Sequence, residues 1–280
     1  MTVRIVTDST ADLLPETAAE LGVSVVPLSV IFGEETLREG IDISHDLFYE
    51  RLIRSKDLPT TSAPSVGEFI AAYEEVLKET DEIVSIHLSS KLSATHNNAV
   101  QAARHLSDSG AKIDVIDSDF VSLGVGFLVQ AASMAAARGA SVEEIKQLMA
   151  DMMPRIHILV VLDTLEYVRK GGRIGRARAF LGSVLKVKPL LSIRGGEVAP
   201  EERIRTKKAV MERLYQIAMS YPNVEKFGIA YSTNASEAEE LRQKLASGLP
   251  GAHIEICRLG PVLGVHGGPG VLGLGVLQAE

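Results

Sequence analysis

In the first half of the chain, short apolar runs alternate with segments whose apolar residues recur at helical spacing. The apolar runs predict four strands, at 3–6, 23–30, 83–88 and 112–117. The helical patterns lie at 7–22, 44–55, 65–80, 96–106 and 119–138. Strands that alternate with helices are typical of a parallel sheet covered by helices. We therefore expect residues 1–155 to form an N-terminal α/β domain with a parallel sheet.

The pattern changes near residue 155. Two predicted strands flank the turn at Gly195 and Gly196 and look like a hairpin. Strands are predicted at 156–162, 187–193, 197–199, 226–231 and 253–258, and helices at 164–170, 206–220 and 235–247, with a short helix that ends at Leu185. Hairpins mixed with helices predict a C-terminal α+β domain with a mixed sheet, residues 156–280. The fold class is therefore α/β with two domains.

Composition places the protein in a reducing, aqueous compartment. The single cysteine, Cys257, excludes an intrachain disulfide and argues against a thiolate metal site. The longest uncharged stretch, 259–277, contains seven glycines and two prolines and does not suit a membrane span. Because Arg4 and Asp8 interrupt the N-terminus, it reads as a first strand and not as a signal peptide. We expect a cytoplasmic protein.

Charge is distributed unevenly. The net charge of −7 argues against general nucleic-acid binding. Residues 169–194 nevertheless hold eight basic side chains and no acidic one, so the remainder carries −7 − 8 = −15. Such a segment forms either a solvated basic face or a docking surface for an acidic partner or an anionic head group.

Three hydroxyl-rich loops follow predicted strands or precede helices, at 7–12, 60–65 and 89–98. Each could simply cap a helix, but together they favour one polar pocket, because helix N-termini attract anions. No P-loop is present, and the G-x-G-x-x-G match at 268–273 lacks a βαβ unit. Since these loops contain only one lysine, Lys91, a small anion such as a carboxylate fits better than a polyphosphate.

His266 is the one strong side-chain donor within 259–277, and glycines surround it. It is either a core histidine or a ligand-binding one, because glycines allow a backbone to approach a ligand closely. No nucleophile elbow and no paired-histidine metal motif is present. Asp8, Asp117 and Asp119 follow strands, and helix capping explains them better than a phosphoacceptor role.

Seven motifs occur in an order that resembles the DegV family over essentially the whole chain. They are VTDSTADL, TTSAPS, SSKLSATHNNA, VIDS, DTLEYVRKGGRIG, KPLLSI and GPVLGVHGGPGVLGLGV. The resemblance implies a long-chain fatty acid held in an apolar tunnel between the two domains, with no other cofactor. It further implies a non-enzymatic subunit that presents the carboxylate to a separate ATP-dependent kinase subunit, which makes an acyl phosphate for phospholipid synthesis.

Matched position by position, the resemblance assigns Thr61, Ser93, Asn97 and His266 to the carboxylate site. It assigns Arg169 and Arg173 to kinase docking. Two other functions stay open at this point. One is a regulatory lipid sensor without a kinase role, and the other is a stand-alone hydrolase or phosphotransferase that uses the loop at 89–98.

Overall fold

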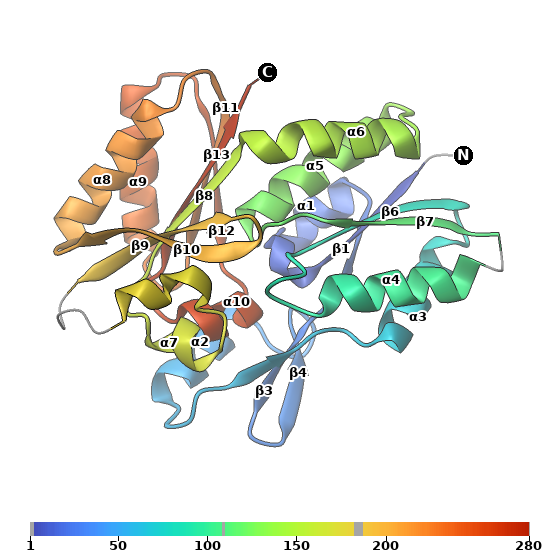
Figure 1. The fold of residues 1–280 in the computed structure, drawn as a ribbon, viewed down its shortest axis with the longest axis horizontal. Helices are drawn as coiled ribbons and strands as arrows, with labels where there is room; N and C mark the ends of the chain where they lie inside the picture. The colour runs from blue at the N-terminus through green and yellow to red at the C-terminus, as the bar shows by residue number, and fades with distance from the viewer. Residues whose placement is uncertain (1–2, 108–109, 182–186, 280) are drawn as a thin grey trace.

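The computed structural model describes residues 3–107, 110–181 and 187–279 (Figure 1). In the first half, four parallel strands form a sheet with the order β2-β1-β6-β7. They are β1 (Arg4–Asp8), β2 (Val23–Val26), β6 (Glu82–His87) and β7 (Lys112–Asp117). The predicted parallel sheet is thus confirmed, and three of its strands lie within a few residues of the expected positions.

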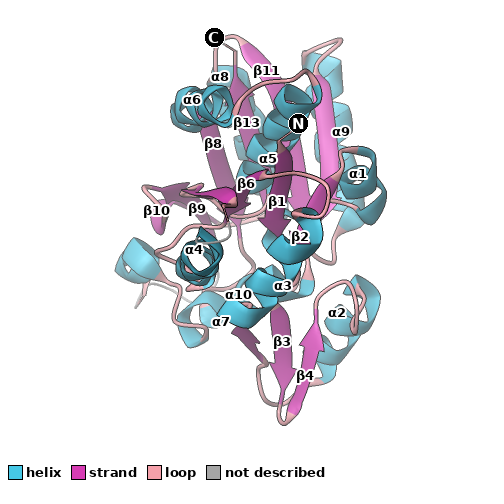
Figure 2. Cartoon of the chain, turned by 90° about the vertical axis from the view of Figure 1, so that its right-hand side faces the viewer, coloured by secondary structure: helices cyan, strands magenta, loops and turns pink. Residues whose placement is uncertain are grey.

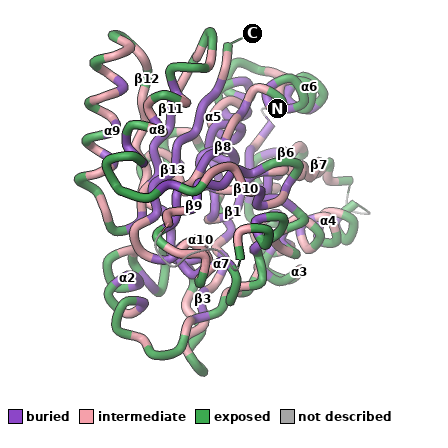
Figure 3. The backbone as a smooth tube through the Cα atoms, turned by 60° about the vertical axis from the view of Figure 1, so that its left-hand side comes forward, coloured by how far each residue is buried: buried purple, intermediate pink, exposed green. Residues whose placement is uncertain are grey.

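Helices cover both faces of this sheet. The helices α3 (Val66–Val76) and α4 (Thr95–Leu106) pack on one face, and α5 (Leu123–Ala137) and α6 (Val142–Met152) pack on the other. A capping box formed by Ser65 and Glu68 begins α3, at the position where the sequence pattern predicted a helix to start. Most of α5 is buried, because this helix also contacts the second large sheet (Figure 3).

The second half forms a six-stranded mixed sheet with the order β10-β9-β8-β13-β11-β12, which confirms the prediction. Its strands are β8 (Ile156–Val161), β9 (Lys188–Arg194), β10 (Glu197–Ile204), β11 (Val224–Tyr231), β12 (His253–Arg258) and β13 (Leu272–Gln278). The helices α8 (Lys207–Ser220) and α9 (Ala235–Gly248) pack on its outer face. The glycine-rich C-terminal segment supplies α10 (Pro261–Gly267) and the central strand β13.

A third, small sheet was not predicted. The apolar run at 23–30, expected to be one strand, divides into β2 and β3 (Ser29–Phe32), which belong to different sheets. Pro27 lies between them and has no N–H to continue a ladder. The strand β3 pairs antiparallel with β4 (Glu35–Arg38) and β5 (Thr60–Ser62). Figure 2 shows this sheet beside α2 (His45–Arg54) at one end of the molecule.

Two predicted helices are also different in the structure. The segment at 7–22 forms a 3₁₀ turn, Ser9–Ala11, and then α1 (Pro15–Glu20), because Asp12 has a left-handed backbone and Pro15 starts a new helix. The helix α7 (Glu166–Lys170) is followed by a 3₁₀ helix, Gly175–Phe180. The expected continuation to Leu185 lies outside the described residues. A further 3₁₀ turn, Met153–Arg155, precedes β8.

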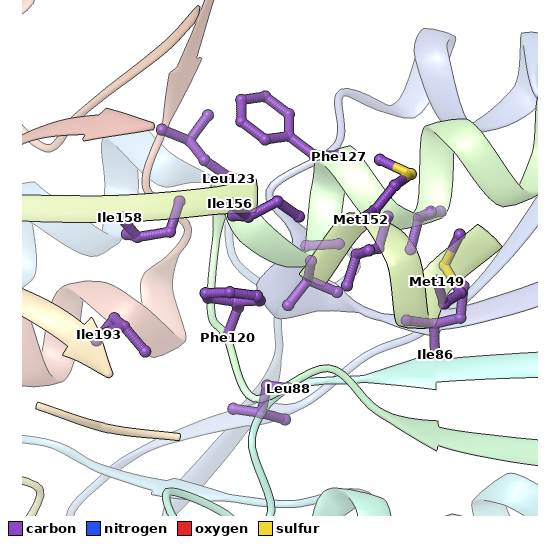
Figure 4. Close-up of a cluster of buried hydrophobic side chains, with 14 of the residues drawn as sticks. Ile86, Leu88, Phe120, Leu123, Phe127, Met149, Met152, Ile156, Ile158 and Ile193 are labelled. Atoms are coloured by element: carbon purple, nitrogen blue, oxygen red, sulfur yellow. The ribbon is translucent and has the colours of Figure 1, made fainter. Parts of the chain in front are cut away.

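The largest hydrophobic cluster surrounds α5 and crosses the expected domain boundary. It contains Val3, Phe127 and Leu277, from both halves of the chain. Figure 4 shows side chains of α5, α6, β6, β8 and β9 converging on this region. The sheets divide near residue 155 although this core does not, so the boundary stays a prediction. None of the helices within the described ranges has both the length and the apolar character needed to cross a membrane.

Candidate ligand-binding cavity

An apolar cavity of about 140 Å³ lies where α5, α10 and the six-stranded sheet meet. A single water needs only about 10–15 Å³. Aliphatic side chains make most of its lining, from both halves of the chain: Leu28, Leu88, Leu92, Val121, Leu123, Ile158, Leu159, Val160, Leu162, Val168, Leu191, Ile193, Val198, Leu259, Val262, Leu263 and Val271. Because apolar cavities of this kind hold water poorly, the site suits an apolar ligand.

The polar lining residues come from distant parts of the sequence. They are Thr61, Ser93, Ser122, Arg173 and His266. The Thr61 hydroxyl on β5 lies 3.1 Å from Nε2 of His266 on α10, although 205 residues separate them. The fold therefore brings together three of the four residues expected at the carboxylate, as parts of one cavity lining.

The other nitrogen of His266 forms no hydrogen bond with any residue in the described part of the chain. Its Nδ1 is buried, and a Cβ atom on Gly171 would lie 2.2 Å from it, so the α7 end approaches the ring closely. Burial, with a contribution from the Arg173 charge, lowers the pKa of His266 to about 4. The ring is thus neutral near pH 7. An unpaired buried nitrogen is costly, and a polar ligand group would satisfy it.

Arg173 extends this polar end toward Ser93. Its Nε donates to the Leu92 carbonyl at 3.1 Å, and its Nη1 donates to the Gly171 carbonyl at 2.8 Å. The Ser93 hydroxyl lies 2.9 Å from that of Thr95. The family resemblance assigned Arg173 only to docking. Its place in the cavity lining depends on a contact 81 residues away along the chain, which no local pattern reveals.

Several other polar groups of the 89–98 loop form hydrogen bonds with other segments of the protein. Ser89 Oγ donates to the Gly196 carbonyl at 2.8 Å, and Lys91 Nζ donates to the Gly195 carbonyl at 2.7 Å. The Ser90 amide donates to the Asp117 carboxylate at 3.2 Å. Ser89 and Lys91 therefore connect the β9–β10 turn to the first half of the molecule, which accounts for one of the hydroxyls in this stretch.

Two predicted site residues lie on the surface. Asn97, in the first turn of α4, is exposed and does not line the cavity, whereas its neighbour Asn98 donates to the Pro64 carbonyl at 2.8 Å. Arg169 is exposed on α7 and forms no ion pair with any residue that the structure describes. The roles of Asn97 and Arg169 stay predictions.

The loop at 7–12 is engaged within the protein and does not line the cavity. Asp8 accepts hydrogen bonds from the backbone amides of Thr10 and Leu88, each at 3.0 Å, and its other neighbour is His87 Nδ1 at 3.0 Å. The side chains of Asp8, Thr10 and His87 are fully buried. For Asp8, internal hydrogen bonding is therefore the better explanation, as the sequence suggested.

Two further carboxyls, one half-buried and one buried, hold the start of α10. Asp12 accepts from the Gly260 amide at 2.9 Å and from the Ser122 hydroxyl, and Glu39 accepts from the Val262 amide at 3.0 Å. Burial raises the pKa of Asp12 to about 8 and that of Glu39 to about 7. These carboxyls position the helix that carries His266. Among the described residues, no group of three His, Cys, Asp or Glu side chains is arranged to hold a metal.

Comparisons with known proteins agree on one family. A family model described as the DegV family of uncharacterised proteins matches residues 2–279. Protein DegV of Bacillus subtilis is 35% identical, over 98% of both chains. The structure of a DegV family protein from Thermus thermophilus, described as fatty acid binding, superposes with a TM-score of 0.91 at 33% identity over all of both chains. A stearic acid-binding protein from Eubacterium ventriosum gives 0.89 at 28% identity, over 99% of this chain and 98% of that one.

Proposed function

Because the chain belongs to the DegV family, we propose that it binds a long-chain fatty acid in its apolar cavity. The observation that carries the proposal is an apolar cavity lined in part by His266, whose buried Nδ1 has no partner among residues 3–107, 110–181 and 187–279. The fatty-acid binding described for similar structures supports it. Burying about fifteen methylenes contributes roughly 12 kcal/mol of transfer free energy. Association and ordering offset several kcal/mol of this.

The carboxylate binds at the polar end, between Thr61, Ser93 and His266, with Arg173 as the neighbouring positive charge. A carboxylate removed from water requires hydrogen bonds, or it takes up a proton. Ser93 offers a hydroxyl donor. The Thr61 hydroxyl donates to Nε2 of the neutral His266 ring, so the single ring N–H is at Nδ1, where it can donate to the carboxylate. These few contacts orient the ligand, whereas the apolar walls provide most of the affinity.

We also propose that the protein presents this carboxylate to a separate ATP-dependent kinase subunit. In that reaction a carboxylate oxygen bonds to the γ-phosphorus of ATP, the bond from that phosphorus to the ADP oxygen breaks, and an acyl phosphate results. The exposed Arg169 and Arg173, beside the polar end of the cavity, are suited to docking an acidic partner surface. The acyl phosphate would then serve phospholipid synthesis.

Native mass spectrometry of the purified protein tests the binding proposal. We expect a co-purifying fatty acid, released by solvent extraction and rebound on addition of palmitate. Ser93→Ala and His266→Ala should each weaken palmitate binding by about tenfold, the loss expected for one hydrogen bond to a charged group. The matched control is Ser247→Ala, which removes an exposed hydroxyl bonded to the Gln243 carbonyl. No bound fatty acid and no uptake would refute the proposal.

The same preparation separates the other functions. Turnover of an acyl ester or a phosphoryl donor by the isolated protein would favour a stand-alone enzyme. Tight palmitate binding without acyl phosphate formation, when a fatty acid kinase subunit and ATP are added, would favour a lipid sensor.

A further inference from the structure

A second cavity adjoins the first. It has a volume of about 230 Å³, and its lining shares Ile158, Leu159 and Ile193 with the apolar cavity. Phe120, Met153 and Ile156 add further apolar surface. Figure 4 shows Ile158 and Ile193 on β8 and β9, with the Phe120 ring close by. Only a few side chains therefore separate the two spaces.

The second cavity coincides with a gap in the six-stranded sheet. The strand β8 pairs with β13 along its whole length, but with β9 only over 159–161. Its first three residues thus have no β9 partner, and the last two residues of β9 lie beyond the paired region. The cavity is lined by His157 and Ile158 on one side of this gap and by Ile193 and Arg194 on the other.

The polar side chains around the second cavity already have partners. His157 Nε2 lies 2.8 Å from Gln278 Oε1, and its ring stacks on Tyr221 with centroids 4.5 Å apart. Arg194 forms a 2.9 Å ion pair with Glu201, which also accepts from Ser192 at 2.6 Å. An apolar chain that enters this space therefore leaves no charge unpaired, so the cost of desolvating polar groups is small.

We propose that this gap is a distal port of the acyl cavity, through which the methyl end of a very long acyl chain extends. The inference rests on the proposed fatty-acid binding. The carboxylate stays at the polar end, and methylenes that exceed the first cavity pass between Ile158 and Ile193 into the second. Because each further methylene is still removed from water, affinity does not fall sharply at a fixed chain length.

Competition binding of palmitate, stearate and behenate tests the port. We expect the wild-type protein to bind behenate within about threefold of palmitate, a difference under 1 kcal/mol at about 1.4 kcal/mol per factor of ten. Ile156→Phe should fill part of the second cavity and weaken behenate binding about tenfold, with palmitate binding retained, because Ile156 does not line the first cavity. Ile156→Val, which leaves the second cavity open, is the matched control. Wild-type protein that binds palmitate but rejects behenate overturns the port alone, whereas failure to bind either acid overturns the fatty-acid proposal itself.

A second measurement locates the chain end without any substitution. Behenate with a photoreactive diazirine at its methyl end is bound to wild-type protein, irradiated and mapped by peptide mass spectrometry. We expect adducts on the residues that line only the second cavity, such as Met153, Ile156, His157, Arg194 or Tyr221. Adducts confined to residues that line only the first cavity, such as Leu191 or Val198, overturn the port.

Discussion

At the scale of single residues, two carboxyls make the clearest physical demand on the fold. Asp12 is half-buried and Glu39 is buried, burial raises the pKa of both carboxyls, and the negative charge of Asp8 raises both further. Tyr49 and Cys257 face the same cluster, and burial raises the pKa of both. Since both carboxyls accept amide hydrogen bonds at the start of α10, their ionisation bears on how firmly that helix is held.

We predict that the stability of the protein falls as pH rises toward 8. The pKa of Asp12 is about 8 in the folded state and near 4 in the unfolded state, so the folded state binds more protons between these values. The stabilisation that comes from the raised pKa of Asp12 is fully present below pH 4 and is lost as pH rises through 8. For one group the loss is at most about 1.4 kcal/mol per pH unit.

Urea unfolding at a series of pH values measures this dependence. Asp12→Asn keeps the shape of the side chain but cannot ionise, and it should flatten the slope. Asp81→Asn, at an exposed position, is the control and should leave the slope unchanged. An Asp12→Asn protein with the full wild-type slope would show that Asp12 does not cause the pH dependence of stability.

The sequence predicted individual site residues unevenly. It indicated that hydroxyls in the 89–98 loop do more than cap a helix, and Ser93 does line the cavity. It could not separate Ser93 from Ser89, because the partner of Ser89 lies 107 residues away in another strand hairpin. A hydroxyl that binds a ligand and one that fastens two segments look alike in a local pattern.

At the scale of elements, the β9–β10 turn joins the two halves of the molecule. Gly195 and Gly196 both have positive φ, +55° and +77°, as the double glycine led us to expect of a tight hairpin. Gly196 also has little free space, because an added Cβ would lie 2.5 Å from Ser89 Oγ and 2.8 Å from Asp119 Oδ1. The glycine is therefore needed for its conformation and for this close approach.

We predict that Gly196→Ala destabilises the protein by about 2–4 kcal/mol, through backbone strain and loss of the Ser89 contact. Gly33→Ala is a matched control, because Gly33 has φ of +63° but open space around it. This substitution should lower the free energy of unfolding by only about 1–2 kcal/mol, which is the cost of the backbone strain alone. The comparison uses denaturant unfolding of both variants, and equal losses would show that the close approach to Ser89 has no energetic weight.

The type of each element was easier to predict from the sequence than the strands with which it pairs. The edge strands β7 and β12 have the predicted bounds, since their apolar pattern is complete within the segment. The strand β13 was not specified, because its many glycines hide the pattern, yet it lies at the centre of the sheet. The division into β2 and β3 depends on which sheet each strand joins, which is a tertiary property.

At the scale of the whole molecule, the basic segment is only partly neutralised. Lys170 pairs with Glu166 at 2.6 Å and Arg194 with Glu201 at 2.9 Å, so a part of the local charge reversal is balanced by neighbours. Arg169 has no such pair with any described residue, and Arg173 bonds only to carbonyl groups there. Arg173 therefore leaves positive charge at the polar end of the cavity, and Arg169 adds a second charge on α7, on a protein whose net charge is −7.

This arrangement predicts a separation between ligand binding and partner docking. Arg169→Glu should lower the rate of acyl phosphate formation by a fatty acid kinase subunit about tenfold at low kinase concentration, because charge reversal slows association and weakens docking. Palmitate affinity should stay unchanged, since Arg169 does not line the cavity.

Arg138→Glu makes the same charge change at an exposed position on the C-terminal cap of α5 and serves as the control. The wild-type rate should also fall with added salt, as expected when exposed charges steer the encounter. Equal kinase-dependent rates for the two variants would remove Arg169 from the docking surface, and a loss of palmitate affinity in Arg169→Glu would place it in the ligand site instead.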